Sequence, residues 1–343
     1  MVADNRLELG LGLRARHPSV LAEHSRQAEE AGFSHVWLYD SPRCAEPYVS
    51  LPYCAMATSR AVVGLAVTNT QTRDPTVVAN GFATLAILTG GRVKFGVGLG
   101  DSAVKFIGRK PHRFDAFRES IDVVQGLLRG ESVPYNGRCL ALPAVPDVKP
   151  PLLLAAERPR TFELAGAAAD GAIISPGGSP RFLRYAIGRI REGAARAGRE
   201  PDALHICAWT HCVVGDTTEE AMDALAPEVG RTLFKAALRV PPEVLGASGP
   251  LLSEELRAHV LDGVTRQDHE YDLARTLRSA LGDDLFREMT LAGTPDDCAG
   301  KIAELAEVDG LSQLIVNVYG RNREFALKTL GGEMSRGPST PLR

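Results

Sequence analysis

Residues 62–101 read VVGLAVTNTQTRDPTVVANGFATLAILTGGRVKFGVGLGD. The apolar run 62–67 predicts a strand, residues 76–89 predict a helix that ends at a glycine pair, and residues 93–99 predict a second strand. A strand, a helix and another strand in this order form one βαβ unit with parallel strands. We therefore expect an α/β protein with helices packed on a parallel sheet.

Polar residues and glycines follow both strands of this unit. Thr68 and Asn69 come after the first strand, and Gly98, Gly100 and Asp101 come at the end of the second. The carboxyl ends of parallel strands meet at one edge of the sheet, where α/β proteins bind their ligands. Glycines also let backbone N–H groups approach an anion closely. This edge is therefore the predicted ligand site, and its glycines predict an anionic group on the ligand.

Further strands are predicted along the chain at residues 7–13, 35–39, 152–155, 172–175, 204–214 and 313–319. Helices are predicted between most of them, at residues 18–31, 47–58 and 114–128 and in a segment that ends at 169. With the first two strands, this alternation over 343 residues predicts a (β/α)8 TIM barrel. The barrel is expected to form one domain, residues 1–330.

Two insertions and a tail are predicted around this barrel. Residues 131–147 contain Asn136-Gly137, the turn signal of a β-hairpin. Residues 217–306 lie between the seventh and eighth strands and predict a long, mostly helical insertion, which we interpret as a lid or wall over the barrel mouth. Residues 331–343 are expected to be a flexible tail.

Composition narrows the possible functions. The net charge of −3 offers no basic surface for nucleic acid or an anionic membrane. No signal-peptide pattern is present, and no apolar run approaches the ~18 residues of a membrane span. The six cysteines are scattered without a CxxC pair, so neither a disulfide framework nor a metal site is expected. We expect a cytoplasmic protein with reduced thiols that acts on a small molecule.

Five segments carry a resemblance to a known family: AEEAGFSHVWLYD at 28–40, GLAVTNTQTRDP at 64–75, ATLAILTGGR at 83–92, GVGLGDSA at 96–103 and LAGAAADGAI at 164–173. In this order they resemble the bacterial-luciferase-like superfamily of flavin and deazaflavin oxidoreductases. The closest branch looks like the methylenetetrahydromethanopterin reductases, which use coenzyme F420. The resemblance implies a TIM barrel that is usually a homodimer. It also implies a cofactor ring held against a bulge in the third strand, with a non-proline cis peptide bond at Ala66–Val67.

The same resemblance implies which residues form the site. Asp40 and Ser41, after the second strand, take the catalytic positions. A histidine often stands at the position of Ser41 in related deazaflavin enzymes, and a serine cannot titrate near neutral pH. The loop after the fifth strand precedes a helix N-terminus, which suits a phosphate, and Arg158 or Arg160 could pair with that phosphate. The cofactor-binding positions are Asp40, Ala66, Val67, Thr68, Asn69, Gly98, Gly100, Asp101, Ala155, Ala156, Glu157 and Arg158.

Other polar positions have two interpretations. Arg73 either contacts the ligand or pairs with Asp74 to build the turn. The sequence PGG at 176–178 is either a second phosphate site or a turn. Trp209 and His211 share one face of a predicted strand, where they either floor a substrate pocket or belong to the core. The segment GLGDSA also matches a loose dinucleotide-binding GxGxxA pattern, but it follows the fourth strand and not the first.

The leading functional hypothesis is an F420-dependent oxidoreductase that moves a hydride between the deazaflavin and a small organic substrate. The first alternative is an FMN-dependent luciferase-like monooxygenase, in which reduced flavin activates oxygen. The second is a non-catalytic flavin-binding subunit. A hydride acceptor that is already cationic, such as an iminium, needs no proton from the enzyme, so the presence of Ser41 does not exclude the leading hypothesis.

Overall fold

The βαβ unit predicted for residues 62–101 is formed by β3 (Val62–Asn69), α3 (Pro75–Thr89) and β4 (Val93–Gly98). The Asp74 side chain accepts a hydrogen bond from the backbone N–H of Thr76 and caps the start of α3. Gly90 ends the helix in the left-handed conformation, with φ of +61°, which glycine adopts without steric cost. The two strands are parallel neighbours, as predicted.

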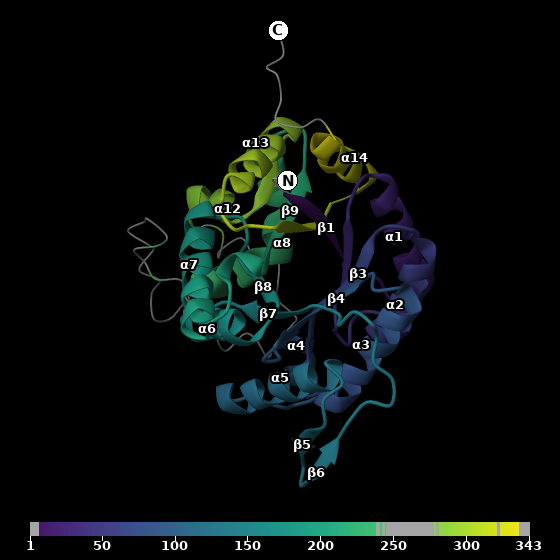
Figure 1. Cartoon of the computed structure of the whole chain (residues 1–343). Coiled ribbons are helices and arrows are strands. Elements are labelled where there is room, and N and C mark those ends of the chain that lie inside the picture. Colours follow the sequence, from purple (N-terminus) through teal and green to yellow (C-terminus); the bar gives the residue numbers. More distant parts are fainter. Residues whose placement is uncertain are drawn as a thin grey trace, which may run out of the picture.

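The computed structural model describes residues 7–237, 241, 244, 278, 281–320 and 323–335. Eight parallel strands form a closed barrel with helices around it (Figure 1). Consecutive barrel strands pair with each other, and the pairing of β1 with β11 closes the ring. The prediction of a TIM barrel is confirmed. Its other strands are β1 (Glu8–Leu13), β2 (His35–Leu38), β7 (Leu152–Ala156), β8 (Gly171–Ile174), β9 (His205–Val214) and β11 (Gln313–Val318).

Helices cover the outside of the barrel, and a hairpin of β5 (Val133–Tyr135) and β6 (Arg138–Leu140) projects from one side of it, as predicted (Figure 1). Within the described part of the chain, no helix is long and apolar enough to cross a lipid bilayer. The remaining helices are α1 (Pro18–Glu30), α2 (Pro47–Ala57), α4 (Ser102–Phe106), α5 (Phe114–Leu128), α6 (Pro159–Ala168), α7 (Pro180–Arg196), the 3₁₀ turn η1 (Pro201–Ala203), α8 (Thr218–Ala237), α12 (Asp283–Met289), α13 (Pro295–Ala306) and α14 (Arg323–Ser335).

The segment 217–306, predicted to be mostly helical, also contains the short strand β10 (Leu291–Gly293), which pairs in parallel with the end of β9. A strand of three apolar residues is too short to show a periodicity in the sequence. The predicted tail also begins too early, because α14 continues to Ser335 and Gly331 packs against the end of α1. Much of the predicted lid, and residues 336–343, lie outside the described residues.

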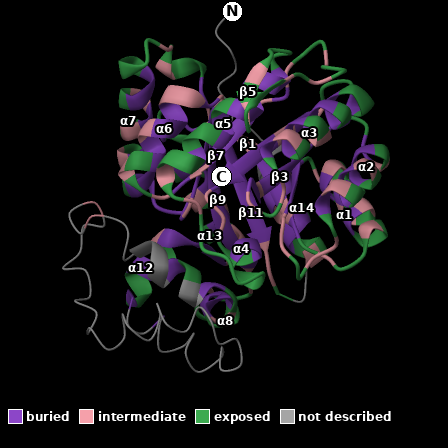
Figure 2. Ribbon diagram, turned by 90° about the horizontal axis from the view of Figure 1, so that it is seen from below, coloured by how far each residue is buried: buried purple, intermediate pink, exposed green. Residues whose placement is uncertain are grey.

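The barrel interior is filled by large side chains that face glycines. Figure 2 shows the buried residues gathered on the strands and on the inner faces of the helices. Trp37 on β2 is buried between Gly10 on β1 and Gly64 on β3. A Cβ at Gly64 would lie 2.8 Å from the indole ring and 2.3 Å from the carbonyl oxygen of Lys94. The indole therefore requires glycine at this position.

Replacing Gly64 by alanine should lower the free energy of unfolding by about 1–3 kcal/mol, because the new methyl group overlaps backbone and ring atoms. Gly188 in α7 is the control, since a Cβ there meets no atom within 4 Å. Gly188→Ala should instead raise stability by roughly 0.5–1 kcal/mol, the difference in helix propensity. Urea unfolding of the two variants measures both values. Equal stability of Gly64→Ala and wild type would contradict the packing described.

Candidate active site

One half of the barrel mouth is lined by small side chains. Along β3, β4 and β7, the inward positions nearest the carboxyl ends carry Val67, Gly98 and Ala155. These three positions adjoin one another, because a Cβ at Gly98 would lie 3.1 Å from Val67 and 3.3 Å from Ala155. Ile173 lies below them in the interior. This half therefore presents a surface with few projecting atoms, which we call the small-residue half.

The opposite half, built by β1, β2, β9 and β11, is polar and aromatic. The Arg14 guanidinium lies 5.2 Å from the ring centroid of Tyr39 and 5.0 Å from that of Tyr319. The Tyr39 hydroxyl donates a hydrogen bond to Asn317 Oδ1, and the Asn317 amide donates to the backbone at Thr210 over 2.8 Å. His211 Nδ1 lies 3.1 Å from the Tyr319 hydroxyl. We call this cluster of Arg14, Tyr39, His211, Asn317 and Tyr319 the polar half.

His211 is a neutral imidazole at the mouth. Its side chain is buried, and its Nε2 has no hydrogen-bond partner among the described residues. Burial lowers the pKa of His211 to about 3, and the nearby Arg14 charge lowers it further in the same direction. At neutral pH His211 can therefore share a hydrogen bond, but it does not carry a proton to donate as an acid.

Asp40 lies beside the bulge of β3, where Thr68 holds it. The Thr68 hydroxyl donates a hydrogen bond of 2.6 Å to Asp40 Oδ2, and the Tyr48 hydroxyl lies 3.4 Å from the same threonine oxygen. Burial raises the pKa of Asp40, while the Thr68 bond and the Arg73 charge oppose the rise. Asp40 therefore takes up a proton more readily than an exposed aspartate. Ser41, the other predicted catalytic residue, accepts a backbone hydrogen bond from Cys44 through its carbonyl oxygen, in a turn.

The predicted bulge is present. The Ala66–Val67 peptide bond is cis, as expected from the resemblance. The pairing of β3 with β4 shifts register between Leu65 and Thr68, which brackets this bond. Ala66 is buried, and both residues pack in the inner barrel cluster with Trp37 and Trp209. Trp209 belongs to this buried cluster, which agrees with the interpretation of Trp209 as a core residue and does not test the floor role.

Asn69 and Arg73 shape the loop after β3. Asn69 Oδ1 accepts hydrogen bonds from the backbone N–H groups of Gln71 and Thr72, and its amide nitrogen donates to the Thr72 hydroxyl. The side-chain amide of Asn69 is thus already bonded within the loop. Arg73 forms an ion pair with Glu46 and lies 4.2 Å above the Tyr48 ring. It does not build the turn through Asp74, whose carboxylate instead caps α3.

The glycine loop after β4 leads directly into a short helix. Gly100 has a φ of +92°, and a Cβ there would lie 2.5 Å from the Val104 side chain, so glycine is required. The next helix was predicted only near Phe114, but α4 begins at Ser102. Asp101 is exposed and forms an ion pair with Lys105 on this helix. A five-residue helix was missed because it is too short to show helical periodicity.

The loop after β7 uses its own backbone donors. Ala155 and Ala156 end the strand, and the N–H groups of Glu157 and Arg158 both donate to the Thr161 hydroxyl over 3.2 Å. Arg160 lies over the Phe114 ring, with its guanidinium carbon 4.0 Å from the centroid. The donors expected for a phosphate are therefore bonded within the protein in this structure.

Residues 176–178 form a buried turn. The Ser175–Pro176 bond is cis, and the Gly177 N–H donates to the Trp209 carbonyl oxygen over 2.7 Å. A Cβ on Gly178 would lie 2.4 Å from backbone atoms of Met289. These glycines allow close packing against β9 and α12, so the turn interpretation is correct and the phosphate interpretation is not supported.

Arg14, Tyr39 and Tyr48 are mouth residues that the sequence interpretation missed. Arg14 directly follows β1 and continues the inward alternation of Gly10 and Gly12. Extending that alternation by one step past the strand end would have found it. Tyr48 lies on α2 and contacts the site only through tertiary packing, so no local pattern marks it.

Residues 2–311 match the family described as luciferase-like monooxygenase. The chain belongs to this family. The 5,10-methylenetetrahydromethanopterin reductase of Methanolobus tindarius is 27% identical to it over 92% of this chain and 95% of that protein. The F420-dependent hydroxymycolic acid dehydrogenase of Mycobacterium tuberculosis is 32% identical over 60% of this chain and 61% of that protein. The resemblance drawn from the sequence is confirmed.

Solved structures share the luciferase-like fold. The coenzyme F420 dependent tetrahydromethanopterin reductase from Methanopyrus kandleri superposes with a TM-score of 0.76 at 23% identity, covering 96% of this chain and 98% of that one. An F420-dependent secondary alcohol dehydrogenase in complex with an F420-acetone adduct gives 0.74 at 20% identity, covering 95% and 98%. The long-chain alkane monooxygenase LadA gives 0.67 at 16% identity, covering 98% and 93%. At these identities the likeness concerns the fold alone.

The pH dependence of stability should reveal the neutral state of His211. Its folded pKa of about 3 lies below the ordinary value near 6.5, so between these values the unfolded chain binds a proton that the folded protein does not. The free energy of unfolding therefore falls as the pH falls below 6.5. Between pH 7 and 5, wild type should lose about 2 kcal/mol more than His211→Gln, which cannot titrate. Urea unfolding measures both losses of unfolding free energy between pH 7 and 5. An equal loss in wild type and in His211→Gln would contradict the neutral state of His211 in the folded protein.

Proposed function

We propose that this luciferase-like protein is an F420-dependent oxidoreductase that transfers a hydride between the deazaflavin and a small organic substrate. The observation that carries the proposal is the β3 bulge facing the small-residue half of the mouth. Val67, Gly98 and Ala155 carry small side chains or none, which leaves room for a planar ring against these strands. A side chain at position 98 would fill that space. The names of the relatives supply the choice of F420 as the ring.

The residues around the bulge fit such a group. When bound, a deazaflavin supplies the hydride, and the protein supplies orientation, a dry surface and electrostatics. Asp40 is held next to the bulge by Thr68 and has a raised pKa, so it can hold or release a proton beside the bulge. Asn69 keeps the adjoining loop in shape, and the backbone at Gly98 and Gly100 can approach the ring's substituents closely.

The polar half of the mouth is the proposed substrate side. Arg14 is permanently charged, and the two tyrosine rings beside it hold its guanidinium. His211 adds its Nε2 atom, which has no hydrogen-bond partner among the described residues. These groups favour a substrate that carries oxygen atoms or negative charge. Because Ser41 cannot act as an acid, any proton given to the substrate would come from Asp40 or solvent, and a cationic acceptor would need none.

An FMN-dependent monooxygenase is the second candidate. The likeness in fold to LadA and the name of the matching family favour it. Such an enzyme would use the same bulge and the same small-residue half for its flavin. The two candidates differ in cofactor affinity and in reaction with oxygen, so binding measurements separate them.

Parallel titrations with the two cofactors test the proposed function. Reduced F420 should bind with micromolar or better affinity, and FMN at least about tenfold more weakly, a difference of about 1.4 kcal/mol. Fluorescence or absorbance changes of each cofactor follow the binding. Tight FMN binding together with oxygen consumption would overturn the proposal in favour of the monooxygenase.

Asp40 and Asn69 should behave differently on replacement by alanine. Asp40→Ala should weaken F420 binding by about 1–3 kcal/mol, because a buried polar partner is lost, and it should lower the apo melting temperature only slightly, because the Thr68 hydroxyl can turn to the Tyr48 hydroxyl 3.4 Å away. Asn69→Ala should also lower the apo melting temperature, because it removes three hydrogen bonds that shape the loop. Calorimetry and thermal unfolding measure both effects. Unchanged cofactor affinity in Asp40→Ala would remove this residue from the site.

We further propose that the protein is a homodimer joined through α2 and α3. These neighbouring helices expose large apolar side chains on their outer faces, a pattern that marks interaction surfaces. The exposed residues are Val49, Tyr53 and Met56 on α2, and Val77, Ile87 and Leu88 on α3.

Met56→Glu should convert the dimer to a monomer, because it places a charge on this apolar surface. Val148→Glu is the matched control, since Val148 is also exposed but lies outside α2 and α3. Sedimentation velocity at micromolar protein measures the mass of each variant. A dimer that persists in Met56→Glu, or a wild type that is monomeric, would contradict the proposed interface.

A further inference from the structure

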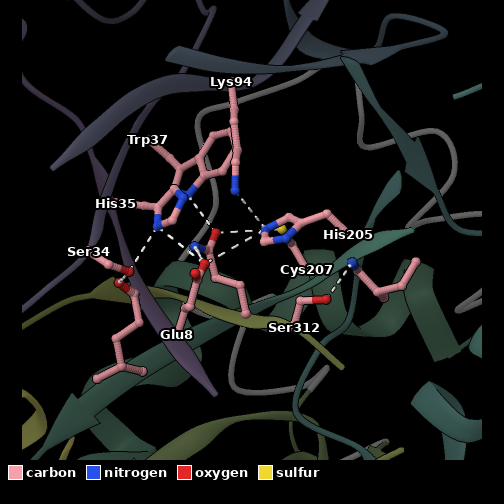
Figure 3. Close-up of polar contacts among 11 residues, drawn as sticks. Glu8, Ser34, His35, Trp37, Lys94, His205, Cys207 and Ser312 are labelled. Carbon is pink, nitrogen blue, oxygen red and sulfur yellow. Dashed lines mark hydrogen bonds and ion pairs between the residues drawn. The ribbon is translucent and has the colours of Figure 1, made fainter. Parts of the chain in front are cut away.

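Three potential metal ligands meet at the amino-terminal end of the barrel, opposite the active site (Figure 3). Glu8, His35 and His205 are the first residues of β1, β2 and β9. Glu8 Oε2 lies 3.6 Å from His35 Nδ1 and 4.0 Å from His205 Nε2, and the three ligand atoms all lie within 4.8 Å of one another. Only the closed barrel brings these positions together, because they are far apart in the sequence.

The spacing is close to that of a zinc site. Zinc binds imidazole nitrogen and carboxylate oxygen at about 2.0–2.2 Å, so neighbouring ligand atoms in a tetrahedral site are roughly 3.3–3.5 Å apart. To reach this spacing, Glu8 Oε2 would have to move closer to each of the two histidine nitrogens by less than about an ångström. The Glu8 side chain is 43% exposed and can make that movement. Gln313 Nε2 donates to Glu8 Oε2 over 3.2 Å and helps to orient the carboxylate.

Both histidine side chains are largely enclosed by protein, His35 more than His205. The Ser34 hydroxyl donates to the carbonyl oxygen of Leu9, and it also lies 2.8 Å from His35 Nδ1. His35 Nε2 has no hydrogen-bond partner among the described residues.

Lys94 supplies a positive charge to the same cluster. Its Nζ lies 3.3 Å from His205 Nε2, on the nitrogen that would bind a metal (Figure 3). An ammonium group and a divalent cation would compete for this lone pair. Among the described residues, Cys207 also lies beside the cluster, and its thiol lies 3.5 Å from Gln313 Oε1.

We propose that Glu8, His35 and His205 form a zinc-binding site and that Lys94 competes with the metal for His205. The site would fasten the start of β1 to β2 and to β9, across the place where the two ends of the chain close the barrel. The amino-terminal face of a TIM barrel contributes to stability and not to catalysis. The expected role is therefore structural, and it is independent of the proposed cofactor.

Zinc titration of the EDTA-treated full chain tests this site. The background is Cys139→Ser, which removes the exposed thiol. A chromophoric chelator in competition reports the affinity, and Co²⁺ absorption reports tetrahedral coordination. The variants are Glu8→Gln, His205→Gln and Lys94→Met, with His112→Gln as a matched histidine control outside the cluster. Circular dichroism establishes that each variant is folded.

One zinc ion per chain should bind and raise the melting temperature. Glu8→Gln and His205→Gln should each weaken binding by about tenfold or more, and Lys94→Met should strengthen it by about tenfold. His112→Gln should bind as the background does. Absence of stoichiometric binding, or equal affinity in the background and in the Glu8 and His205 variants, would overturn the site. Unchanged affinity in Lys94→Met would overturn the competition. Lys94→Met is expected to bind zinc more tightly than the background does. The proposal therefore stays testable even if Glu8→Gln or His205→Gln fails to fold.

Discussion

The enclosure of Trp37 in the barrel interior is the constraint on which the rest of this structure depends. The indole lies on β2 between glycines of β1 and β3, and its Nε1 donates a hydrogen bond of 2.9 Å to Gln313 on β11. A side chain on either glycine would overlap the ring. One aromatic group thus sets the spacing of four neighbouring strands, including β11, which pairs with β1 to close the barrel.

The same principle repeats one layer higher, where the site begins. Gly12 on β1 leaves room for Asn317, since a Cβ there would lie 1.9 Å from the amide oxygen. Asn317 in turn holds the Tyr39 hydroxyl, and Tyr39 packs edge-on against Trp209 at 5.1 Å. The polar half of the mouth therefore rests on glycine-permitted packing below it. On the other half, Gly96 leaves room for the Val67 and Ile173 side chains, and Gly98 lies between Val67 and Ala155 in the surface proposed for the cofactor ring.

The parts of this picture that depend on local sequence could be predicted. The βαβ unit at 62–101, the Asn136-Gly137 hairpin and the cis bond at Ala66–Val67 follow from adjacent residues or from a contiguous motif. The contact of Asp40 with Thr68 also agrees with the expected meeting of strand ends. These features require only the order of the elements and the polarity of the residues at their ends.

The rest depends on contacts between distant positions. Tyr39 contacts Asn317, and Glu8 lies close to His205, only in the closed barrel. A short stretch of sequence therefore cannot predict these contacts. β10 and α4 were missed because three and five residues are too few to establish a period. The hydrogen bonds from the Glu157 and Arg158 N–H groups to the Thr161 hydroxyl likewise depend on side-chain geometry. The residue types in this loop do not predict that geometry.

The most direct measurement of the central claim is a crystal structure of the protein with F420 bound. We expect the deazaflavin ring at the carboxyl end of the barrel, against the Ala66–Val67 bulge, with Gly98 and Ala155 along one edge and Arg14 and His211 facing the opposite side. A cavity of about 660 Å³ between α5 and the β5–β6 hairpin is another place on the described surface that has room for a ligand. A ring bound in that cavity, with the mouth unchanged, would contradict the account.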